Sequence, residues 1–378
     1  MIIGNREGKE NFLAFLCFIM NIACITFVML TSHTTGSGKD AITTISHGDF
    51  SSFSVQVAHY GATLLSFHTN KEFGDMEILG GYKSLEDLHI GYASRNWVMA
   101  PFANRIPNGR YTWQGREYIL PEGSRMHGLV AKEVWDLLDV STGEGSIKLT
   151  FTLDSLSDGV EGYPFELLYT LTYTISLEGV TMEITATNVG EQDAPYFVGW
   201  HTYFTLGESR PDNLMLQIPS NTGVAMDNSL VPLDGKEAFV SRKKRSRLDY
   251  RKPKKIRKSI IDDYFVMQDN IPEAYLTNTS KKISIAITGE RGCIIAFTSD
   301  SLEDAPRSAI AIEPMEGIAN SFNRGDMQKQ ILLKAGTSRS YSASFTLTGV
   351  ELSDDDESRF ILATMGVGAV DAITAILS

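Results

Sequence analysis

The most regular pattern in the chain is a strict alternation of apolar and polar residues over positions 165–177. Apolar side chains occupy every second position, with mostly Thr and Ser between them: Phe165, Leu167, Tyr169, Leu171, Tyr173, Ile175 and Leu177. Because successive side chains of a strand point to opposite faces, this period predicts a long strand with one buried face. Glu178 and Gly179 then predict a tight turn, after which alternating apolar residues over 180–186 predict a partner strand.

Shorter runs rich in β-branched and aromatic residues predict further strands, and turn residues separate them. They fall at residues 53–59, 62–69, 135–140, 146–153, 293–298, 309–313 and 338–347. Between them, no run with the helical period has comparable strength. We therefore predict an all-β fold, a sandwich of large antiparallel sheets that forms one domain over residues 41–350.

An apolar segment precedes this domain. Residues 12–30 contain no charged side chain, and their length nearly reaches the roughly 20 residues that a helix needs to span a bilayer. We predict an N-terminal apolar helix within residues 1–40, and favour an uncleaved membrane anchor over a cleaved signal peptide, with a wrongly assigned start as the third alternative. A genuine segment places the protein in a membrane or outside the cell, whereas a wrong start leaves it cytoplasmic.

The end of the chain, residues 351–378, differs in composition from the predicted domain. An acidic stretch at 354–357 leads into an apolar tail over 360–377, which Asp371 and two glycines interrupt. The interruption favours a short helix, docked on the body of the protein or on a partner, over a second membrane span.

Charge excludes one broad class of partner. The chain carries 34 basic and 46 acidic residues, so its net charge is −12, which makes it a poor binder of nucleic acid over its whole surface. Residues 242–258 depart from this average, with eleven Lys and Arg residues against the single acid Asp249. Because Tyr250 is the only aromatic residue among them, we favour a solvated surface loop over a nucleic-acid patch. Cys293 is the one cysteine outside the apolar segment, so the domain forms no internal disulfide.

Two residues at predicted strand ends can move protons. His201 lies between aromatic residues directly after the strand-like run 196–198, and Glu313 ends the apolar run 309–313. Histidine can hold or release a proton near neutral pH, and a carboxyl group at the end of an apolar strand has a raised pKa and can act as a base. Each residue alone also fits a structural role, as a packed core histidine or as a solvated Glu that caps the next loop.

Predicted loops supply groups that suit a ligand rich in hydroxyl groups. Asn104 and Arg105 lie in a turn-rich stretch before a strand. An Arg fork and an Asn amide can bond several hydroxyl oxygens at once, although the pair also fits a structural turn with a surface Arg. His127 lies in a second loop, and the adjacent carboxylates Asp262 and Asp263 precede aromatic residues. No second His or Cys stands at ligand spacing from either histidine, so we expect no metal site.

Several blocks, taken together and in their order along the chain, resemble the aldose 1-epimerase (galactose mutarotase) family. They are Tyr60-Gly61-Ala62-Thr63-Leu64, Leu79-Gly80-Gly81-Tyr82-Lys83-Ser84-Leu85-Glu86-Asp87, residues 103–111, His127-Gly128, His201-Thr202-Tyr203-Phe204 and Ile312-Glu313-Pro314-Met315. The resemblance covers residues 41–349. It implies a super β-sandwich of the galactose mutarotase type, and an isomerase that interconverts the α and β anomers of free aldohexoses such as glucose or galactose.

The resemblance also implies roles for individual residues. Glu313 matches the family's general base and His201 its general acid. The residues expected to bind the substrate are Asn104, Arg105, His127, Tyr203 and Asp262. This acid–base chemistry requires no metal or cofactor, and the expected partner is a small sugar, not nucleic acid, with possible membrane attachment through residues 12–30.

The chain departs from the family pattern near the expected sugar. Asp263 follows Asp262 where the family has a His, which leaves open which carboxylate faces the sugar, and Ile295 stands where the family has a Gln. The His201 block also occurs in hexose-6-phosphate mutarotases, but these lack the Asn-Arg-Ile block, so they are the second alternative. A non-catalytic carbohydrate-binding protein is the third. The presence of both His201 and Glu313 favours the enzyme.

Overall fold

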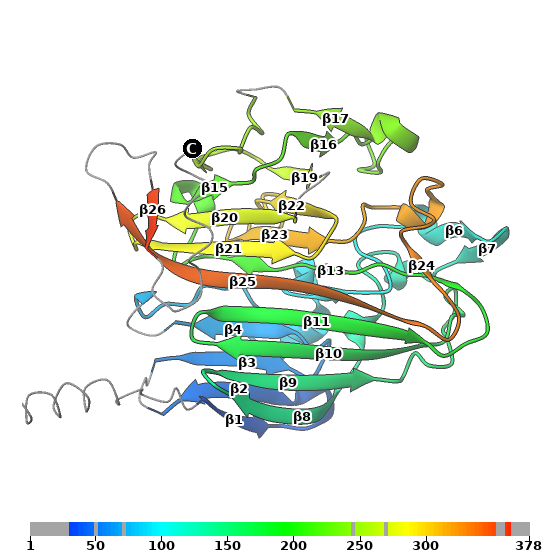
Figure 1. The fold of residues 1–378 in the computed structure, drawn as a ribbon, viewed down its shortest axis with the longest axis horizontal. Coiled ribbons are helices and arrows are strands. Elements are labelled where there is room, and N and C mark those ends of the chain that lie inside the picture. Colours follow the sequence, from blue (N-terminus) through cyan, green and yellow to red (C-terminus); the bar gives the residue numbers. More distant parts are fainter. Residues whose placement is uncertain are drawn as a thin grey trace, which may run out of the picture.

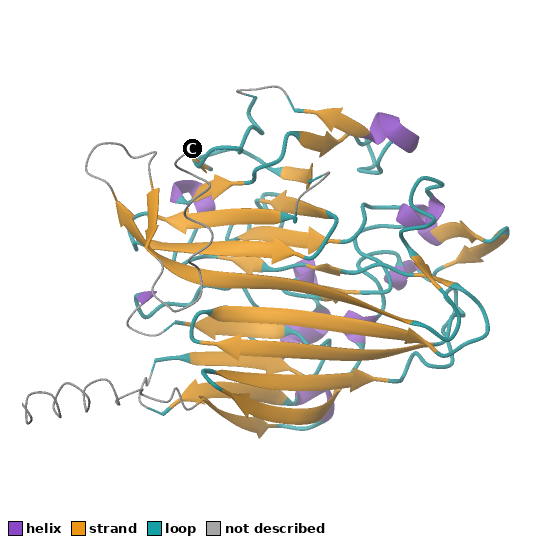
Figure 2. Ribbon diagram, viewed as in Figure 1, coloured by secondary structure: helices purple, strands orange, loops and turns teal. Residues whose placement is uncertain are grey.

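The computed structural model describes residues 30–48, 52–69, 73–242, 246–267, 271–352 and 360–363. Strands are the main regular elements of the structure, and the helices are short (Figures 1 and 2). The expected N-terminal apolar helix lies outside the described residues. Within the ranges given above, no helix is both long enough and apolar enough to cross a membrane.

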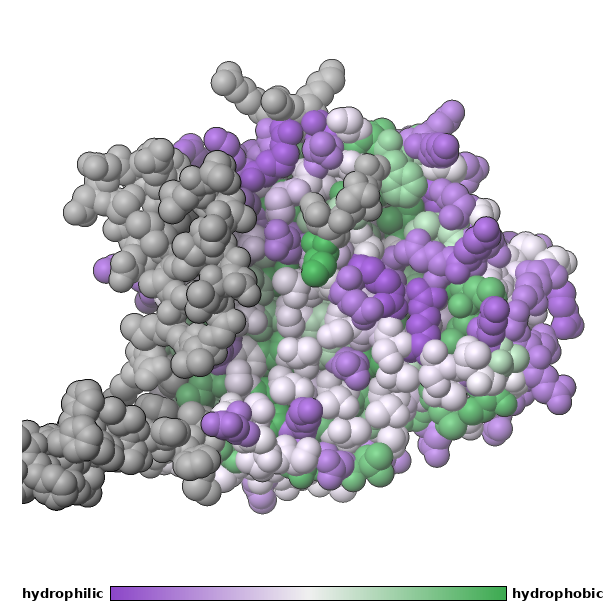
Figure 3. Space-filling view, in the orientation of Figure 1, coloured by the Kyte–Doolittle hydropathy of each residue, from purple (hydrophilic) through white to green (hydrophobic). Residues whose placement is uncertain are grey.

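The predicted long strand and its partner lie inside a ten-stranded antiparallel sheet (Figure 1). Its order is β18 (Lys254–Lys255), β15 (Met215–Gln217), β20 (Glu273–Asn278), β21 (Ile283–Gly289), β25 (Ser338–Leu352), β11 (Gly179–Asn188), β10 (Leu167–Ser176), β9 (Ser146–Leu153) and β8 (Asp136–Gly143), with β26 (Phe360–Ala363) on β25. In β10 every second residue is buried, as the alternation predicts. The middle of the outer face is mostly pale in Figure 3, which is the colour of intermediate hydropathy.

A second sheet, of eight strands, contains Glu313 and the strands on either side of His201. Its order is β17 (Phe239–Ser241), β16 (Thr222–Val224), β19 (Asp262–Val266), β22 (Cys293–Phe297), β23 (Ile310–Met315), β13 (Gly199–Trp200) and β5 (Val98–Met99), with β14 (Tyr203–Phe204) on β23. The remaining strands form a four-stranded sheet of β1 (Leu30–Thr35), β2 (Ile42–His47), β3 (Ser54–Ala58) and β4 (Leu64–His68), and the pairs β6 (Arg110–Trp113) with β7 (Arg116–Ile119) and β12 (Ala194–Pro195) with β24 (Leu332–Leu333). The described helices are α2 (Leu85–Ile90) and the short 3-10 helices η1 (Gly38–Asp40), η3 (Tyr92–Ser94), η4 (Pro107–Gly109), η5 (Glu122–Ser124), η6 (Val130–Lys132), η7 (Pro211–Asn213), η8 (Gly235–Ala238) and η9 (Ser321–Asn323).

Aromatic side chains join the sheets into one core. Phe345 of β25 stacks on Trp200 of β13 with ring centroids 6.0 Å apart, and meets Phe204 of β14 at 5.5 Å. Phe345 also contacts Phe67 of β4 at 5.5 Å. All four rings are fully buried, and burial of side chains of this size contributes about 1.5–3 kcal/mol each. The predicted all-β sandwich of antiparallel sheets is confirmed.

Both ends of the described chain differ from the sequence prediction. Leu30–Thr35 forms β1 and pairs with β2, although the sequence predicts apolar segment and linker there. Phe360–Ala363 forms the strand β26, although the sequence predicts a helix in this region. The reason is the length of β25, whose last residues extend beyond the part that pairs with β11 and leave an open edge for another strand. The acidic stretch and the rest of the tail lie outside the described residues.

The basic segment 242–258 is packed against the protein in its described part, which corrects the prediction of a solvated loop. Tyr250 and Ile256 are fully buried, and the segment contributes β18 to the ten-stranded sheet. Lys254 places its Nζ 4.4 Å from the ring centroid of Tyr250, and the Arg242 side chain is only 9% exposed. The number of charges does not predict this burial. The buried residues Tyr250 and Ile256 lie between the cationic residues, and the aliphatic parts of long Lys and Arg side chains can pack on apolar surface.

A charged network around Arg307 joins segments that are distant in sequence. Arg307 is 3% exposed and donates to Asp212 Oδ1 at 2.6 Å and to Asp300 Oδ1 at 2.9 Å. Lys258 donates to the other carboxylate oxygen of Asp212 at 2.6 Å. Desolvation raises the pKa of Asp212, but the hydrogen bonds from Lys258 and Arg307 outweigh it and lower this pKa to about 2.

This network predicts a loss of stability in acid. The pKa of Asp212 is about 2 in the folded protein and 3.8 without the network, so the unfolded chain binds more protons between these values. The contribution of Asp212 is therefore complete above pH 3.8 and is lost as the pH falls toward 2. We expect Asp212→Asn to lower the free energy of unfolding at neutral pH and to flatten its fall in acid, measured by urea unfolding at several pH values. Asp304→Asn, at an exposed position, is the control. The prediction is contradicted if the free energy of unfolding falls equally steeply with acid in the Asp212 variant and in the wild type.

Candidate active site

His201 and Glu313 meet on one face of the eight-stranded sheet. Trp200 and Phe204 point into the aromatic core described above, so the alternation of the chain turns His201 and Tyr203 to the opposite face. Tyr203 pairs with Ala311 in β23, two residues before Glu313. His201 Nε2 lies 3.5 Å from Glu313 Oε1, and their side chains are 7% and 3% exposed.

Burial opposes charge on both members of this pair. Desolvation raises the pKa of Glu313 well above its ordinary value, and the negative charge of Asp262 raises it further. Desolvation likewise lowers the pKa of His201 to about 3. In the described part of the chain, His201 Nδ1 and Glu313 Oε2 are buried without a hydrogen-bond partner. Buried polar atoms of this kind are rare in folded proteins, and at a candidate site they are free to bond a ligand.

His127 lies against His201, as the site prediction requires. Their ring centroids are 4.9 Å apart, with an interplanar angle of 76°. His127 Nδ1 lies 2.8 Å from the sulfur of Met99, and its backbone N–H donates to Asn104 O at 2.8 Å. Burial is the main cause that lowers the pKa of His127 well below 6.5, with smaller effects from His201 and Arg105. His127 is therefore neutral near pH 7 and can donate or accept a hydrogen bond.

Tyr203 supports the His201 ring from the side. The two rings are nearly parallel, with centroids 5.0 Å apart and an interplanar angle of 12°. The Tyr203 hydroxyl donates to Ala93 O at 3.1 Å, and the side chain is fully buried. Arg95 places its guanidinium carbon 5.0 Å from the Tyr203 ring centroid. In this arrangement Tyr203 holds the imidazole in place through its ring.

Asn104 and Arg105 are held by main-chain contacts with other loops. Asn104 has φ +59°, a value that Asn tolerates, and its Oδ1 accepts from Arg105 N at 2.9 Å. Arg105 Nη1 donates to Ser229 O at 3.0 Å, and the backbone O of Arg105 accepts from Asn320 N at 2.8 Å. Arg105 Nε is buried without a partner among the described residues. The sequence gives no sign of the Ser229 contact, which depends on a loop distant in the chain.

Asp262 and Asp263 of β19 have different surroundings. Asp262 interacts electrostatically with Glu313 and with Arg105; burial raises the pKa of Asp262, and Arg105 acts against this rise. Asp263 instead lies 3.5 Å from Arg242 Nη2. Because neighbouring residues of a strand point to opposite faces, Asp262 is the carboxylate on the Glu313 side. Ile295 of β22 lies directly opposite Glu313 and is 2% exposed.

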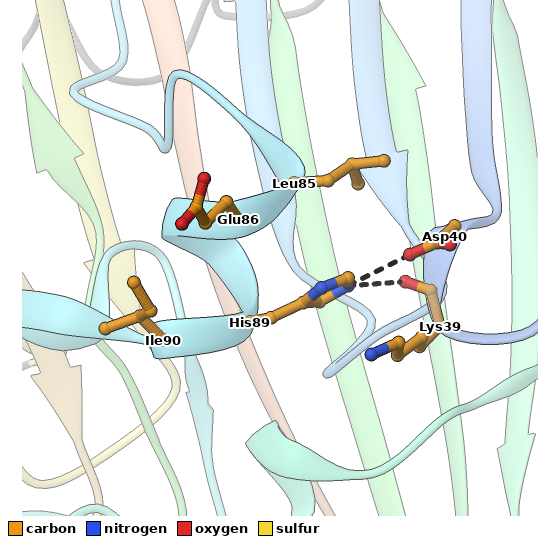
Figure 4. Close-up of a pocket in the computed structure, with 6 residues that line it drawn as sticks. All are labelled: Lys39, Asp40, Leu85, Glu86, His89 and Ile90. Carbon is orange, nitrogen blue, oxygen red and sulfur yellow. Dashed lines mark hydrogen bonds and ion pairs between the residues drawn. The ribbon is translucent and has the colours of Figure 1, made fainter.

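Two cavities lie outside the predicted site residues. A hollow of about 530 Å³ is lined by residues of α2 and η1, and in Figure 4 His89 points toward Asp40 and the backbone of Lys39. Another, of about 350 Å³, includes Cys293, which pairs with Met315 of β23. In the described ranges, no cluster of His, Cys, Asp and Glu has the arrangement of a metal site.

Comparisons with known proteins place the chain among sugar isomerases. Residues 42–346 match the family described as aldose 1-epimerase. The uncharacterized protein YihR of Escherichia coli (strain K12) is 29% identical over 234 residues, which are 60% of this chain and 71% of that protein. Galactose mutarotase of Rattus norvegicus is 29% identical over 192 residues, which are 47% of this chain and 53% of that protein. The chain thus spans about half of that mutarotase.

A solved structure agrees with the sandwich fold. Galactose 1-epimerase from Lactobacillus acidophilus NCFM superposes with a TM-score of 0.71 over 85% of this chain and 99% of its own, at 18% identity. The family match contains β2, both members of the His201–Glu313 pair and most of β25. The chain therefore belongs to the aldose 1-epimerase family and, as an epimerase, is an isomerase.

Proposed function

We propose that the protein interconverts the α and β anomers of a free aldohexose, of the glucose or galactose type, at the His201–Glu313 pair. The contact of 3.5 Å between His201 Nε2 and Glu313 Oε1, in surroundings that exclude water, is the observation that supports this most. A protein that only binds sugar needs hydroxyl contacts, but it does not need a desolvated acid and base side by side. The similarity to proteins named galactose mutarotase and aldose 1-epimerase supports the same reaction.

Proton exchange at two sugar oxygens is the core of the proposed mechanism. Glu313 removes the proton of the O1 hydroxyl while His201 delivers a proton to the ring oxygen, so the bond from C1 to the ring oxygen breaks and the open-chain aldehyde forms. Rotation about C1–C2 presents the other face of the carbonyl group. The reverse proton transfers then close the ring as the other anomer. The pair ends with the proton count with which it began.

The other residues are proposed to bind and orient the sugar. Arg105 Nε, which has no partner among the described residues, and His127, which contacts His201, suit oxygens close to the ring oxygen. Asp262, on the Glu313 side of β19, suits a sugar hydroxyl as an acceptor. Asn104 orients Arg105 by accepting from its backbone, and Tyr203 completes the wall behind His201.

We expect Glu313→Gln to reduce mutarotation by about 10²–10⁴-fold, because Gln keeps the shape of the side chain but cannot accept the O1 proton. The measurement is polarimetry on freshly dissolved α-D-glucose and α-D-galactose, with the spontaneous rate in the same buffer subtracted. Glu237→Gln, at an exposed position in η8, is the matched control and should leave the rate unchanged.

The same measurement separates the alternatives. Binding of the sugar without acceleration by the wild-type protein would contradict the proposal and indicate a non-catalytic carbohydrate-binding protein. Acceleration of glucose 6-phosphate in preference to glucose would instead indicate a hexose-6-phosphate mutarotase.

The shifted pKa values predict a broad pH profile. Desolvation raises the pKa of Glu313 and lowers that of His201 to about 3, so the pair holds one proton over the whole range between them. Without sugar these shifts place the proton on Glu313. The proposed mechanism uses the other arrangement of the same one-proton form, in which Glu313 is ionised and His201 carries the proton. The two arrangements hold equal numbers of protons, so their ratio does not change with pH. We expect kcat/KM to be flat from neutral pH down toward 3, where His201 takes up a second proton, and to fall at high pH where Glu313 loses its proton. An acid limb centred near 6.5, the ordinary pKa of histidine, would contradict this.

Variants of the adjacent residues Asp262 and Asp263 test which of the two carboxylates binds the sugar. We expect Asp262→Asn to raise KM about 10–100-fold, because a hydrogen bond to a charged group contributes about 1.5–3 kcal/mol. Asp263→Asn should leave KM unchanged and lower the midpoint of urea unfolding, because Asp263 pairs with Arg242. Kinetics and unfolding curves on both variants test this, and a larger KM effect for Asp263→Asn would reverse the assignment of the two residues.

A further inference from the structure

We propose that Asn96 is a positioning residue that fixes the catalytic imidazole of His201 through a clasp formed by residues 91–97. This inference rests on the proposed function, because it assigns Asn96 a part in the proton transfer at His201. No motif in the sequence marks Asn96, which lies between α2 and β5.

The clasp holds both backbone groups of His201. Asn96 N donates to His201 O at 3.0 Å, and His201 N donates to Trp97 O at 2.9 Å. Two opposed bonds of this kind fix the backbone of one residue as a strand pair does. The backbone of His201 therefore cannot move without breaking contacts to adjacent residues of the clasp.

The Asn96 side chain also bonds the backbone of β14 and of β4. Its Oδ1 accepts from Tyr203 N at 2.8 Å, and its Nδ2 donates to Leu64 O at 2.8 Å. Asn96 is fully buried, so both side-chain groups exchange water for these partners. Asn96 thus ties β4 of the four-stranded sheet to the segment that carries His201 and its stacked neighbour Tyr203.

Two other residues of the clasp, Ala93 and Arg95, contact Tyr203. Ala93 O accepts the Tyr203 hydroxyl at 3.1 Å, and the Arg95 guanidinium lies over the Tyr203 ring at 5.0 Å. The Tyr203 ring in turn stacks on the His201 imidazole. The imidazole is therefore constrained from its backbone and from one ring face.

The backbone conformation of the clasp limits which residue types fit at position 96. Asn96 has φ +58°, and Ala93 and Ser94 have φ +62° and +51°. Asn adopts this left-handed region more readily than other side chains apart from glycine, and its short amide reaches two partners at once. Glycine fits the backbone but carries no amide, so Asn96→Gly removes the side-chain bonds without adding strain.

The core on the other side of this segment is held independently. Trp200 and Phe204 pack on Phe345, and neither aromatic contact involves Asn96. Loss of the Asn96 amide should therefore loosen the imidazole while the sheets stay packed. A displacement of about 1 Å in a catalytic group can reduce a rate by about 10²-fold, so the effect belongs in kcat.

The test compares Asn96→Gly with Asn188→Gly in the full chain. Asn188 is also fully buried, and its Nδ2 donates to Gln192 O at 2.8 Å and to Leu333 O at 3.1 Å, but it lies at the end of β11. We expect Asn96→Gly to lower kcat for hexose mutarotation about 10–100-fold with KM little changed, and Asn188→Gly to lower thermal stability while kcat stays at the wild-type value. An unchanged kcat in Asn96→Gly, or an equal loss in Asn188→Gly, overturns the proposal.

Asn96→Asp serves if the glycine variant does not fold. It keeps an acceptor for Tyr203 N and places a carboxyl oxygen against Leu64 O in place of the Nδ2 donor, so the Leu64 bond is lost when this carboxyl group is ionised. We expect an intermediate kcat, and a wild-type kcat from this folded variant overturns the role of the Leu64 bond in the clasp.

A second readout does not depend on activity. NMR titration of the His201 imidazole reports its pKa directly, and we expect this value to rise from about 3 toward 6.5 in Asn96→Gly as the ring gains access to water. If the wild-type protein accelerates no sugar, the proposed function fails, but this titration still decides the clasp. An identical His201 titration in Asn96→Gly and wild type overturns it.

Discussion

The contacts of Trp200, which stacks on Phe345, and of Phe204, which meets Phe345 edge to face, fix the eight-stranded sheet against the ten-stranded sheet. The position of the His201–Glu313 pair depends on them. Side chains alternate between faces along a strand, so the residues that enter this core force His201 and Tyr203 to the other face. The short pairing of Tyr203 with Ala311 then sets which part of β23 lies beside them. Glu313, two residues further on, is brought to His201 by register alone.

Burial gives this pair its chemical character. Among the residues that the structure describes, neither side chain has an ion-pair partner other than the other member of the pair, and desolvation moves the two pKa values in opposite directions. A carboxyl group and an imidazole that both resist charge hold one proton between them, and these shifts place it on Glu313. The transfer to His201 that the proposed mechanism uses therefore has an energetic cost that the bound sugar has to offset. Anomer exchange needs such a reversible donor and acceptor. The same surroundings make the pair sensitive to position, because almost fully buried side chains have little contact with solvent that could replace a lost interaction.

The alternation over β10 and the apolar run before Glu313 predicted these strands and the all-β class, because a period of two is a local property of the sequence. The strands β20 and β21 of the ten-stranded sheet were not among the predicted runs. The family blocks placed the expected site residues, and the structure brings His127 and His201 into contact. What the sequence could not show are contacts made by backbone groups. Ser229 O accepts from Arg105 Nη1, and Asn96 N donates to His201 O. Ser229 and Asn96 use backbone groups here, so no side-chain pattern at these two positions marks the contacts. The burial of Tyr250 within a basic run was missed for a related reason, since composition does not show which residues face the core.

The strand next to Glu313 influences the pKa of this residue. Glu313 lies within β23 and His201 lies directly between β13 and β14, whereas Arg105 and His127 come from loops that bond each other through backbone groups, His127 N to Asn104 O among them. Ile295 belongs to the strand part, directly opposite Glu313 in register. An amide at that position could donate a hydrogen bond to the carboxylate and lower the pKa of Glu313, but an isoleucine cannot, and its apolar surface adds to the desolvation that raises this pKa. Ile295 therefore acts on Glu313 in the same direction as burial, toward a higher pKa.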